Sequence, residues 1–175
     1  GTKEIRLAVG FRAGKELGEG KEFPFIRNAE GMMALINGVG ANNVGLLLDT
    51  WDWVVGDGAM DQISELSAQK ITAVRLGGIP DDVDRGAAES PQRILPAADN
   101  AIDHVALVKH LETIGFEGPI GPTANLLQYS GKTRESIVQA GQEAVDAISK
   151  DAGLHVAPLP MDLIEDIPYE PTPMI

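Results

Sequence analysis

The 175-residue sequence contains no cysteine and only three histidines, His104, His110 and His155. The missing cysteines exclude disulfide bonds, thiolate zinc sites and cysteine nucleophiles. No apolar run approaches the length of a transmembrane helix, and the first residues lack the charged-then-apolar pattern of a signal peptide. We therefore expect a cytoplasmic protein with no membrane partner.

Basic residues are also scarce, with 14 Lys and Arg against 26 Asp and Glu, which gives a net charge of −12. A surface this acidic repels phosphate backbones, so we expect no nucleic-acid partner. The remaining composition, 43% apolar and 23% charged residues, is typical of globular proteins. The length fits about one domain.

Strand-like and helix-like segments alternate along the chain. Apolar runs predict strands at 5–11, 43–49, 71–76 and 119–123. Helical spacing of apolar residues predicts helices over 32–39, 60–66, 105–114 and 133–148. Asn100 with Asp103 can cap the start of the third of these helices. Alternation of this kind indicates a parallel sheet and the α/β class. We therefore assign four βα units to residues 1–150. The proline-rich segment 151–175 is predicted to be an irregular tail that wraps the surface or contacts a partner.

Four βα units leave two architectures open. One is a small open sheet with helices on both faces, and the other is half of an eight-unit barrel. No dinucleotide-binding fingerprint follows the first strand, because Gly10, Gly14, Gly18 and Gly20 have the wrong spacing. A P-loop and a G-x-S-x-G nucleophile motif are absent as well. Periodicity alone does not choose between the two architectures.

Residues 44–53, which read V-G-L-L-L-D-T-W-D-W, resemble the core motif of the sugar phosphate isomerase/epimerase family. Members of this family are xylose isomerase-like TIM barrels. Segments 73–76, 93–96 and 114–119 also resemble family motifs in the same order. The resemblance covers about residues 5–150 and implies barrel units five to eight. It implies a half-barrel that is completed by a second copy, a partner half or an N-terminal half missing from this sequence.

The family chemistry implied by the resemblance is proton transfer beside a sugar carbonyl. A divalent metal, Mn or Mg, is held there by Glu, Asp, His and Glu at the ends of strands five to eight. In this sequence those four positions read Gly10, Asp49, Arg75 and Thr123, and the nearby motif histidine reads Asp52. One ligand of four is kept. We therefore predict no catalytic residues of the family type and, at most, weak metal binding at Asp49.

Several side chains remain candidates for binding a ligand at the strand ends. Trp51 and Trp53 can stack on a sugar ring or pack under a neighbouring loop. Arg93 can meet an anionic group such as a phosphate, or form a surface salt bridge. Asp49 can cap the strand end or pair with Arg75. The complete set of candidate ligand-binding residues is Asp49, Trp51, Asp52, Trp53, Arg75, Arg93, Thr123 and Asn125.

The sequence leaves three hypotheses. The first is a divergent half-barrel that binds a sugar or sugar phosphate, or serves as a subunit, without the family's isomerisation. The second is an active isomerase or epimerase whose metal ligands come from a missing half or a rearranged site. The third is a structural module for assembly, either with itself or with a partner half-barrel. His104 and His110 are expected on a helix, away from the strand ends.

Overall fold

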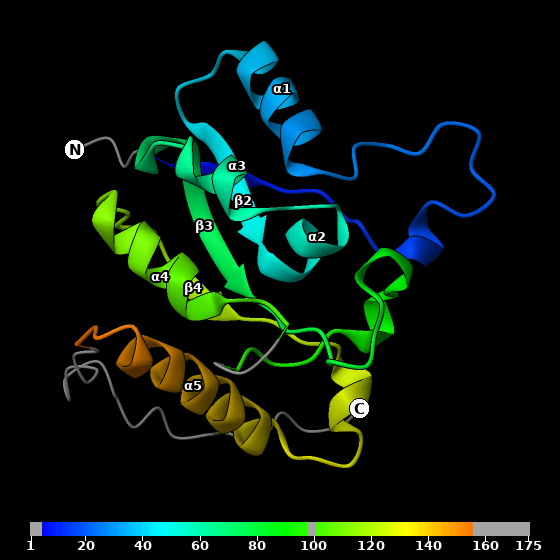
Figure 1. Ribbon diagram of the computed structural model, residues 1–175, viewed down its shortest axis with the longest axis vertical. Coiled ribbons are helices and arrows are strands. Elements are labelled where there is room, and N and C mark those ends of the chain that lie inside the picture. Colours follow the sequence, from blue (N-terminus) through cyan, green and yellow to red (C-terminus); the bar gives the residue numbers. More distant parts are fainter. Residues whose placement is uncertain (1–4, 98–100, 156–175) are drawn as a thin grey trace, which may run out of the picture.

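One parallel sheet organises the computed structural model, which describes residues 5–97 and 101–155. Its strands are β1 (Leu7–Val9), β2 (Val44–Asp49), β3 (Ile71–Leu76) and β4 (Ile120–Pro122). They pair in chain order, and every pairing is parallel (Figure 1). A doubly wound sheet reverses its strand order, whereas a barrel does not. The α/β prediction is therefore confirmed, and the order is that of a half-barrel.

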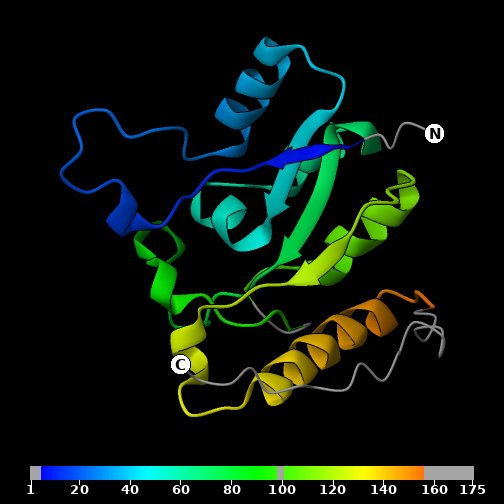
Figure 2. The ribbon, with the colours of Figure 1, turned by 180° about the vertical axis from the view of Figure 1, so that it is seen from behind.

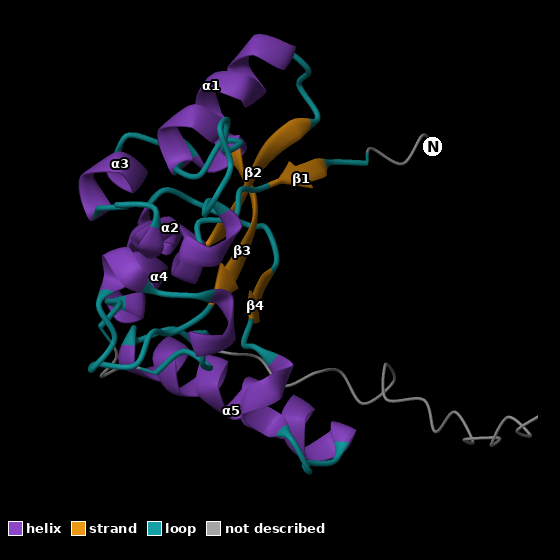
Figure 3. Ribbon diagram, turned by 90° about the vertical axis from the view of Figure 1, so that its right-hand side faces the viewer, coloured by secondary structure: helices purple, strands orange, loops and turns teal. Residues whose placement is uncertain are grey.

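The helices cover one side of the sheet. They are α1 (Ala29–Val39), α2 (Thr50–Val55), α3 (Met60–Ser64), α4 (His104–Thr113) and α5 (Arg134–Asp151). Helices α1 to α4 lie on the same side of the strands (Figure 3), and the view from behind shows the strands in front of the helices (Figure 2). Within the described residues, no helix is long and apolar enough to cross a membrane.

The core lies between the sheet and these helices. Leu46, Leu48 and Val74 project from the strands and are almost fully buried. The residues that alternate with them, such as Leu47 and Ala73, point to the opposite side and are half-buried, because no described helix covers that side. In a closed barrel this second side would be the interior.

Side chains at the ends of strands and loops start the helices. The backbone N–H of Ala106 donates to the carboxylate of Asp103 at 2.8 Å, so the cap predicted for α4 is confirmed. Asn100, its predicted companion, lies outside the described residues. Thr133 caps α5 in the same way.

The second unit and the end of the chain differ from the prediction. The second unit contains a short helix, α2, that begins directly after β2, because the Asp49 side chain accepts from the backbone N–H of Asp52 and caps it. Six residues are too few to show helical periodicity in the sequence. At the other end of the chain, α5 runs to Asp151, and residues 156–175 of the predicted tail lie outside the described residues.

Candidate functional site

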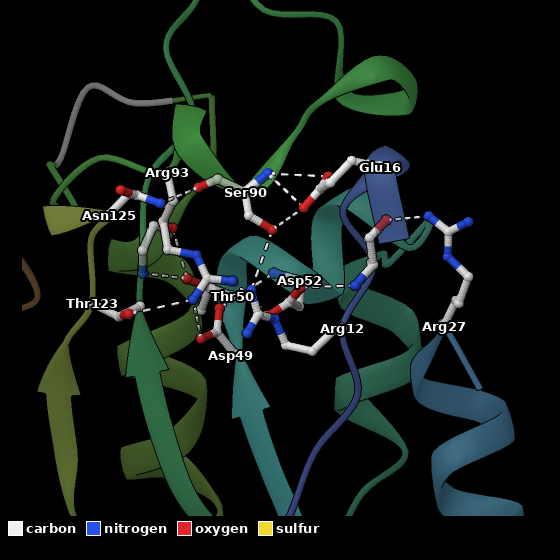
Figure 4. Close-up of polar contacts among 12 residues, drawn as sticks. Arg12, Glu16, Arg27, Asp49, Thr50, Asp52, Ser90, Arg93, Thr123 and Asn125 are labelled. Carbon is white, nitrogen blue, oxygen red and sulfur yellow. Dashed lines mark hydrogen bonds and ion pairs between the residues drawn. The ribbon is translucent and has the colours of Figure 1, made fainter. Parts of the chain in front are cut away.

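The carboxyl ends of the strands bring together residues from distant parts of the chain (Figure 4). Asp49 ends β2 and Thr123 directly follows β4. Arg93 comes from the long connection between β3 and α4 and reaches back over both strands. Ligands of parallel α/β barrels bind at this end, so the geometry of these residues decides what the site can do.

Arg93 is the centre of the cluster and is only 7% exposed. Its Nη1 donates to Asp49 Oδ2 at 3.0 Å and its Nη2 donates to Asp52 Oδ2 at 2.6 Å. Nη1 also donates to the hydroxyl of Thr123 at 3.4 Å. The guanidinium carbon lies 4.8 Å from the centre of the Trp51 ring, within range of a cation–π contact. A buried cation is thus held by two carboxylates and one aromatic face.

The structure decides between some of the alternatives for this cluster. Arg93 forms a salt bridge, but a buried one instead of one on the surface. Asp49 caps the helix that follows its strand and pairs with Arg93, and no ion pair between Asp49 and Arg75 is present in the described part of the chain. Arg75 is exposed, although its strand register places it beside Asp49. The long connection between β3 and α4 places Arg93 beside the carboxylate of Asp49, so this carboxylate already has a partner.

The two aspartates are tied to the backbone as well. Asp52 Oδ1 accepts from the backbone N–H of Ala13 at 2.8 Å, and Asp52 Oδ2 lies 3.4 Å from Arg12 Nε. Burial raises the pKa of the Asp49 carboxyl above its usual value, while the Arg93 guanidinium opposes this shift. The charges of the cluster are therefore compensated by the chain itself.

Both tryptophans that were candidates for ligand binding lie in the core. Trp51 is fully buried beneath Arg93, and Trp53 is 3% exposed. The indole N–H of Trp53 donates to Gln62 Oε1 at 3.1 Å. This burial favours the packing alternative over stacking on a sugar ring.

A hollow of about 330 Å³ opens beside the cluster. Asn125 lines this hollow, and its Nδ2 donates to the Ser90 carbonyl at 3.2 Å. Arg12 Nη2 donates to the Ser90 hydroxyl at 3.2 Å. The lining residues are Arg12, Ser90, Arg93, Ala124, Asn125 and Leu126. A larger hollow, of about 610 Å³, lies near Arg6 and Gly118, at the amino ends of the strands and away from this cluster.

His104 lies on a helix, as expected, but at the strand ends instead of away from them. It is fully buried, and its Nε2 lies 3.1 Å from the Gly77 carbonyl and 3.2 Å from the Thr50 hydroxyl. Burial lowers the pKa of the imidazole, although the nearby carbonyls of Gly77 and Ala97 act against it. His104 is the first residue of α4, and the start of this helix lies near the carboxyl end of β3. The cap predicted at Asp103 marks this start in the sequence and could have indicated where His104 lies.

The metal implied by the resemblance does not fit these residues. Among residues 5–97 and 101–155, no group of three or more acidic or histidine side chains is placed to hold a metal ion. Gly10 and Thr123 supply no carboxylate, and Arg93 engages both Asp49 and Asp52. A hard cation needs several oxygen ligands, including carboxylates free to bind it.

Several solved structures share this fold. An IolI protein with a bound zinc atom is 22% identical, with a TM-score of 0.69 over 83% of this chain and 50% of that chain. A xylose isomerase domain protein from Alicyclobacillus acidocaldarius is 22% identical, with a TM-score of 0.71 over 85% of this chain and 52% of that chain. An L-ribulose 3-epimerase is 17% identical, with a TM-score of 0.54 over 85% and 48%.

The chain spans about half the length of these structures. No curated protein sequence matches it. The family described as xylose isomerase-like TIM barrel matches residues 8–157, which is most of the chain. Together with the parallel strands in barrel order, this match shows that the chain belongs to the xylose isomerase-like TIM barrel family.

Proposed function

We propose that this chain is one half of a barrel that binds a sugar-like ligand at its strand ends, without the family's metal-dependent isomerisation. The observation that carries the proposal is the Arg93 guanidinium between Asp49 and Asp52. The Arg93 side chain pairs with the aspartate that the resemblance assigns as a metal ligand. The negative charge of this aspartate is therefore compensated without a bound ion.

Within the described residues, the two strand-end positions that the resemblance assigns to acid–base glutamates hold Gly10 and Thr123. Proton transfer beside a carbonyl needs a base within hydrogen-bond reach of the ligand, and Gly10 and Thr123 cannot serve as one. Glu16 lies in the same region, bound to Ser90. Burial acts to raise the pKa of Glu16, but hydrogen bonds from Ser90 hold it below the usual value. A carboxylate in that state is a weak base.

Binding of a sugar-like ligand is supported by the position of the hollow. It lies at the carboxyl ends of parallel strands, where barrels of this kind bind small molecules. Its lining includes the polar residues Ser90 and Asn125, whose side-chain types suit ligand hydroxyls. The structural relatives include an L-ribulose 3-epimerase, whose name indicates a sugar substrate.

Calorimetric titration with Mn²⁺ tests the missing metal chemistry. We expect no site in the micromolar range for the unaltered chain, because both aspartates are engaged by Arg93. The Arg93→Gln variant frees these carboxylates, so its Mn²⁺ affinity should rise and fall again when Asp49→Asn is added. A micromolar site in the unaltered chain, lost in Asp49→Asn alone, would contradict the proposal and favour an active isomerase with a rearranged site.

A second function, assembly, is favoured by the open side of the sheet. Strands β1 and β4 each pair on one edge within the described sheet, and Leu7 on β1 is 54% exposed. Leu126 and Leu127, just after β4, are 74% and 72% exposed. We propose that four further βα units, supplied by a second copy or a partner half, pair with both edges. The mass of the chain in solution tests self-closure.

A further inference from the structure

The two outer edges of the sheet carry opposite charges at the amino ends of their strands. Arg6 directly precedes β1, and Glu117 lies shortly before β4. Both residues are exposed, and neither forms an ion pair with any residue that the structure describes. The guanidinium of Arg6 donates to the uncharged backbone carbonyl of Gln69 at 2.6 Å. Each edge therefore presents one charge that is free to pair with an opposite charge.

Arg6 and Glu117 also border the larger hollow, of about 610 Å³, at the amino ends of the strands. Ala73, which points to the uncovered side of the sheet, lines the same hollow. In a closed barrel, side chains from all the strands fill the space on this side. The hollow therefore marks part of the space that the missing strands of a barrel would enclose.

Apolar side chains are exposed on the same two edges, towards the carboxyl ends of the strands. Phe23 and Phe25 lie in the connection after β1 and are 84% and 73% exposed. Leu126 and Leu127 follow β4 and are exposed to a similar extent. Large exposed apolar side chains that gather in one region indicate an interaction surface. Each edge thus combines a charge at one end with an apolar pair towards the other.

We propose that a second copy of this chain closes the barrel, with the β1 edge of each copy against the β4 edge of the other. The inference rests on the assembly of barrel halves proposed above and adds the identity of the partner and the contacts at the seam. A two-fold rotation about the barrel axis relates the copies, so the same seam forms twice and no edge remains unpaired.

The features of the two edges match when they are joined in this way. All strands of the barrel are parallel, so the amino end of the partner's β1 lies beside the amino end of β4. This placement brings the partner's Arg6 to Glu117. The connections that follow the two strands also become neighbours, which brings the partner's Phe23 and Phe25 towards Leu126 and Leu127. Such complementarity is expected of surfaces that bind each other.

Analytical ultracentrifugation of the 175-residue chain at low salt tests the seam. We expect the unaltered chain to have twice the 18.5 kDa mass of one copy. Arg6→Glu and Glu117→Arg each place like charges at both seams. Each variant should therefore raise the dissociation constant of the dimer by about tenfold, because two exposed ion pairs are lost and replaced by repulsion. Added salt should reduce this difference.

An equimolar mixture of the two variants tests which residues face each other. In the mixed dimer, one seam carries both substitutions, whose new charges are opposite. The other seam carries neither substitution and keeps the original pair of Arg6 and Glu117. The mixture should therefore form dimers with nearly the affinity of the unaltered chain, although each variant alone dissociates.

Lys109→Glu and Glu112→Arg are the matched controls, because they reverse the same charges at exposed positions of α4. This helix lies on the covered side of the sheet, away from both edges (Figure 3). Neither control should change the dissociation constant. Circular dichroism checks that all variants are folded.

Each other outcome overturns a defined part of the inference. A monomer in the unaltered chain refutes the second copy and leaves the edges to a partner half. Assemblies larger than a dimer refute closure by two copies. If the dimer ignores both charge reversals, or if the mixture does not recover, this seam is refuted while assembly stands. The Mn²⁺ titration does not depend on these masses, so the proposal about the strand-end site stands or fails separately.

Discussion

Arg93 neutralises two buried aspartates that lie within one helical turn of each other. Replacing it by Gln would leave Asp49 and Asp52 without their buried counter-charge. Breaking a buried ion pair in this way costs about 3–5 kcal/mol. We therefore expect Arg93→Gln to lower the free energy of unfolding by about this amount, measured by urea denaturation.

Arg75→Gln is the control for this prediction. Arg75 is exposed and forms no ion pair with the described residues, so its replacement should change stability by no more than about 0.5 kcal/mol. Equal changes in the free energy of unfolding for the two substitutions would show that the buried ion pairs of Arg93 do not stabilise the fold.

His104 makes stability depend on pH. Its folded pKa lies below the ordinary value of 6.5, so the unfolded chain binds a proton first. The stability gained from the neutral, buried ring is therefore present above the ordinary value and is lost as pH falls through it. The loss of melting temperature between pH 7.5 and 5.5 should be smaller in His104→Gln than in the unaltered chain.

The exposed His155 supplies the matched variant, His155→Gln. It should keep the pH dependence of the unaltered chain. Asp49 acts with the opposite sign, because its raised pKa lets the folded state take up a proton first. The difference between the two histidine variants removes this contribution. If both variants respond alike to pH, His104 is not the responsible group.

The sequence predicted some of the site and missed the rest for physical reasons. Asp49 and Asp52 lie in one recognisable motif, and Thr123 follows a strand, so their location at the strand ends was predictable. Arg93 was a candidate, but its buried pairing with the two aspartates was not predicted, because that pairing depends on the path of a long connection. Arg12 was missed since no periodic pattern shows that its loop folds back onto Asp52.

At the scale of elements, nearly continuous apolar runs made the central strands easy to predict. Residues 43–49 and 71–76 are almost continuously apolar, and β2 and β3 match these ranges closely. The outer strand β1 is shorter than the predicted 5–11. The short helix α2 left no periodic signal, and its cap, Asp49, reads in sequence as a ligand.

The turn between α2 and α3 depends on Gly58. A Cβ at this position would lie 2.2 Å from the Trp53 indole nitrogen and 2.4 Å from the Trp53 carbonyl. Because Trp53 is buried, Gly58→Ala should displace it and cost about 1–3 kcal/mol. Urea denaturation measures the change.

Gly38→Ala is the same substitution at a position where an added Cβ should stabilise the protein. Gly38 lies within α1 and is exposed, and an added Cβ would meet nothing within 4 Å. Alanine is the better helix former, so stability should rise by up to about 1 kcal/mol. A destabilised Gly38→Ala, or an unaffected Gly58→Ala, would contradict this account of the two glycines.

At the scale of the molecule, the open question is what covers the second side of the sheet. If two copies close a barrel, light scattering should give twice the 18.5 kDa mass of one chain. Leu7→Lys places a charge on the free edge of β1 and should shift the equilibrium to monomer, since edge lysines block strand pairing. A monomer in the unaltered chain would refute self-closure.

Leu35→Lys controls for the added charge. Leu35 is 43% exposed on α1, on the helix-covered side of the sheet. Its replacement should leave the mass unchanged. A comparable loss of dimer in both variants would show that association does not use the β1 edge.

The guanidinium of Arg93 is covalently part of the chain, unlike a bound ion. A cation of this kind has no apo form, cannot be stripped by a chelator and cannot be exchanged for a competing ion. Its occupancy is fixed when the protein is synthesised, whatever the supply of trace elements. The chain also contains no cysteine, so the thiol route to oxidative inactivation is closed as well. Under the proposed function, ligand binding would therefore be indifferent to metal starvation.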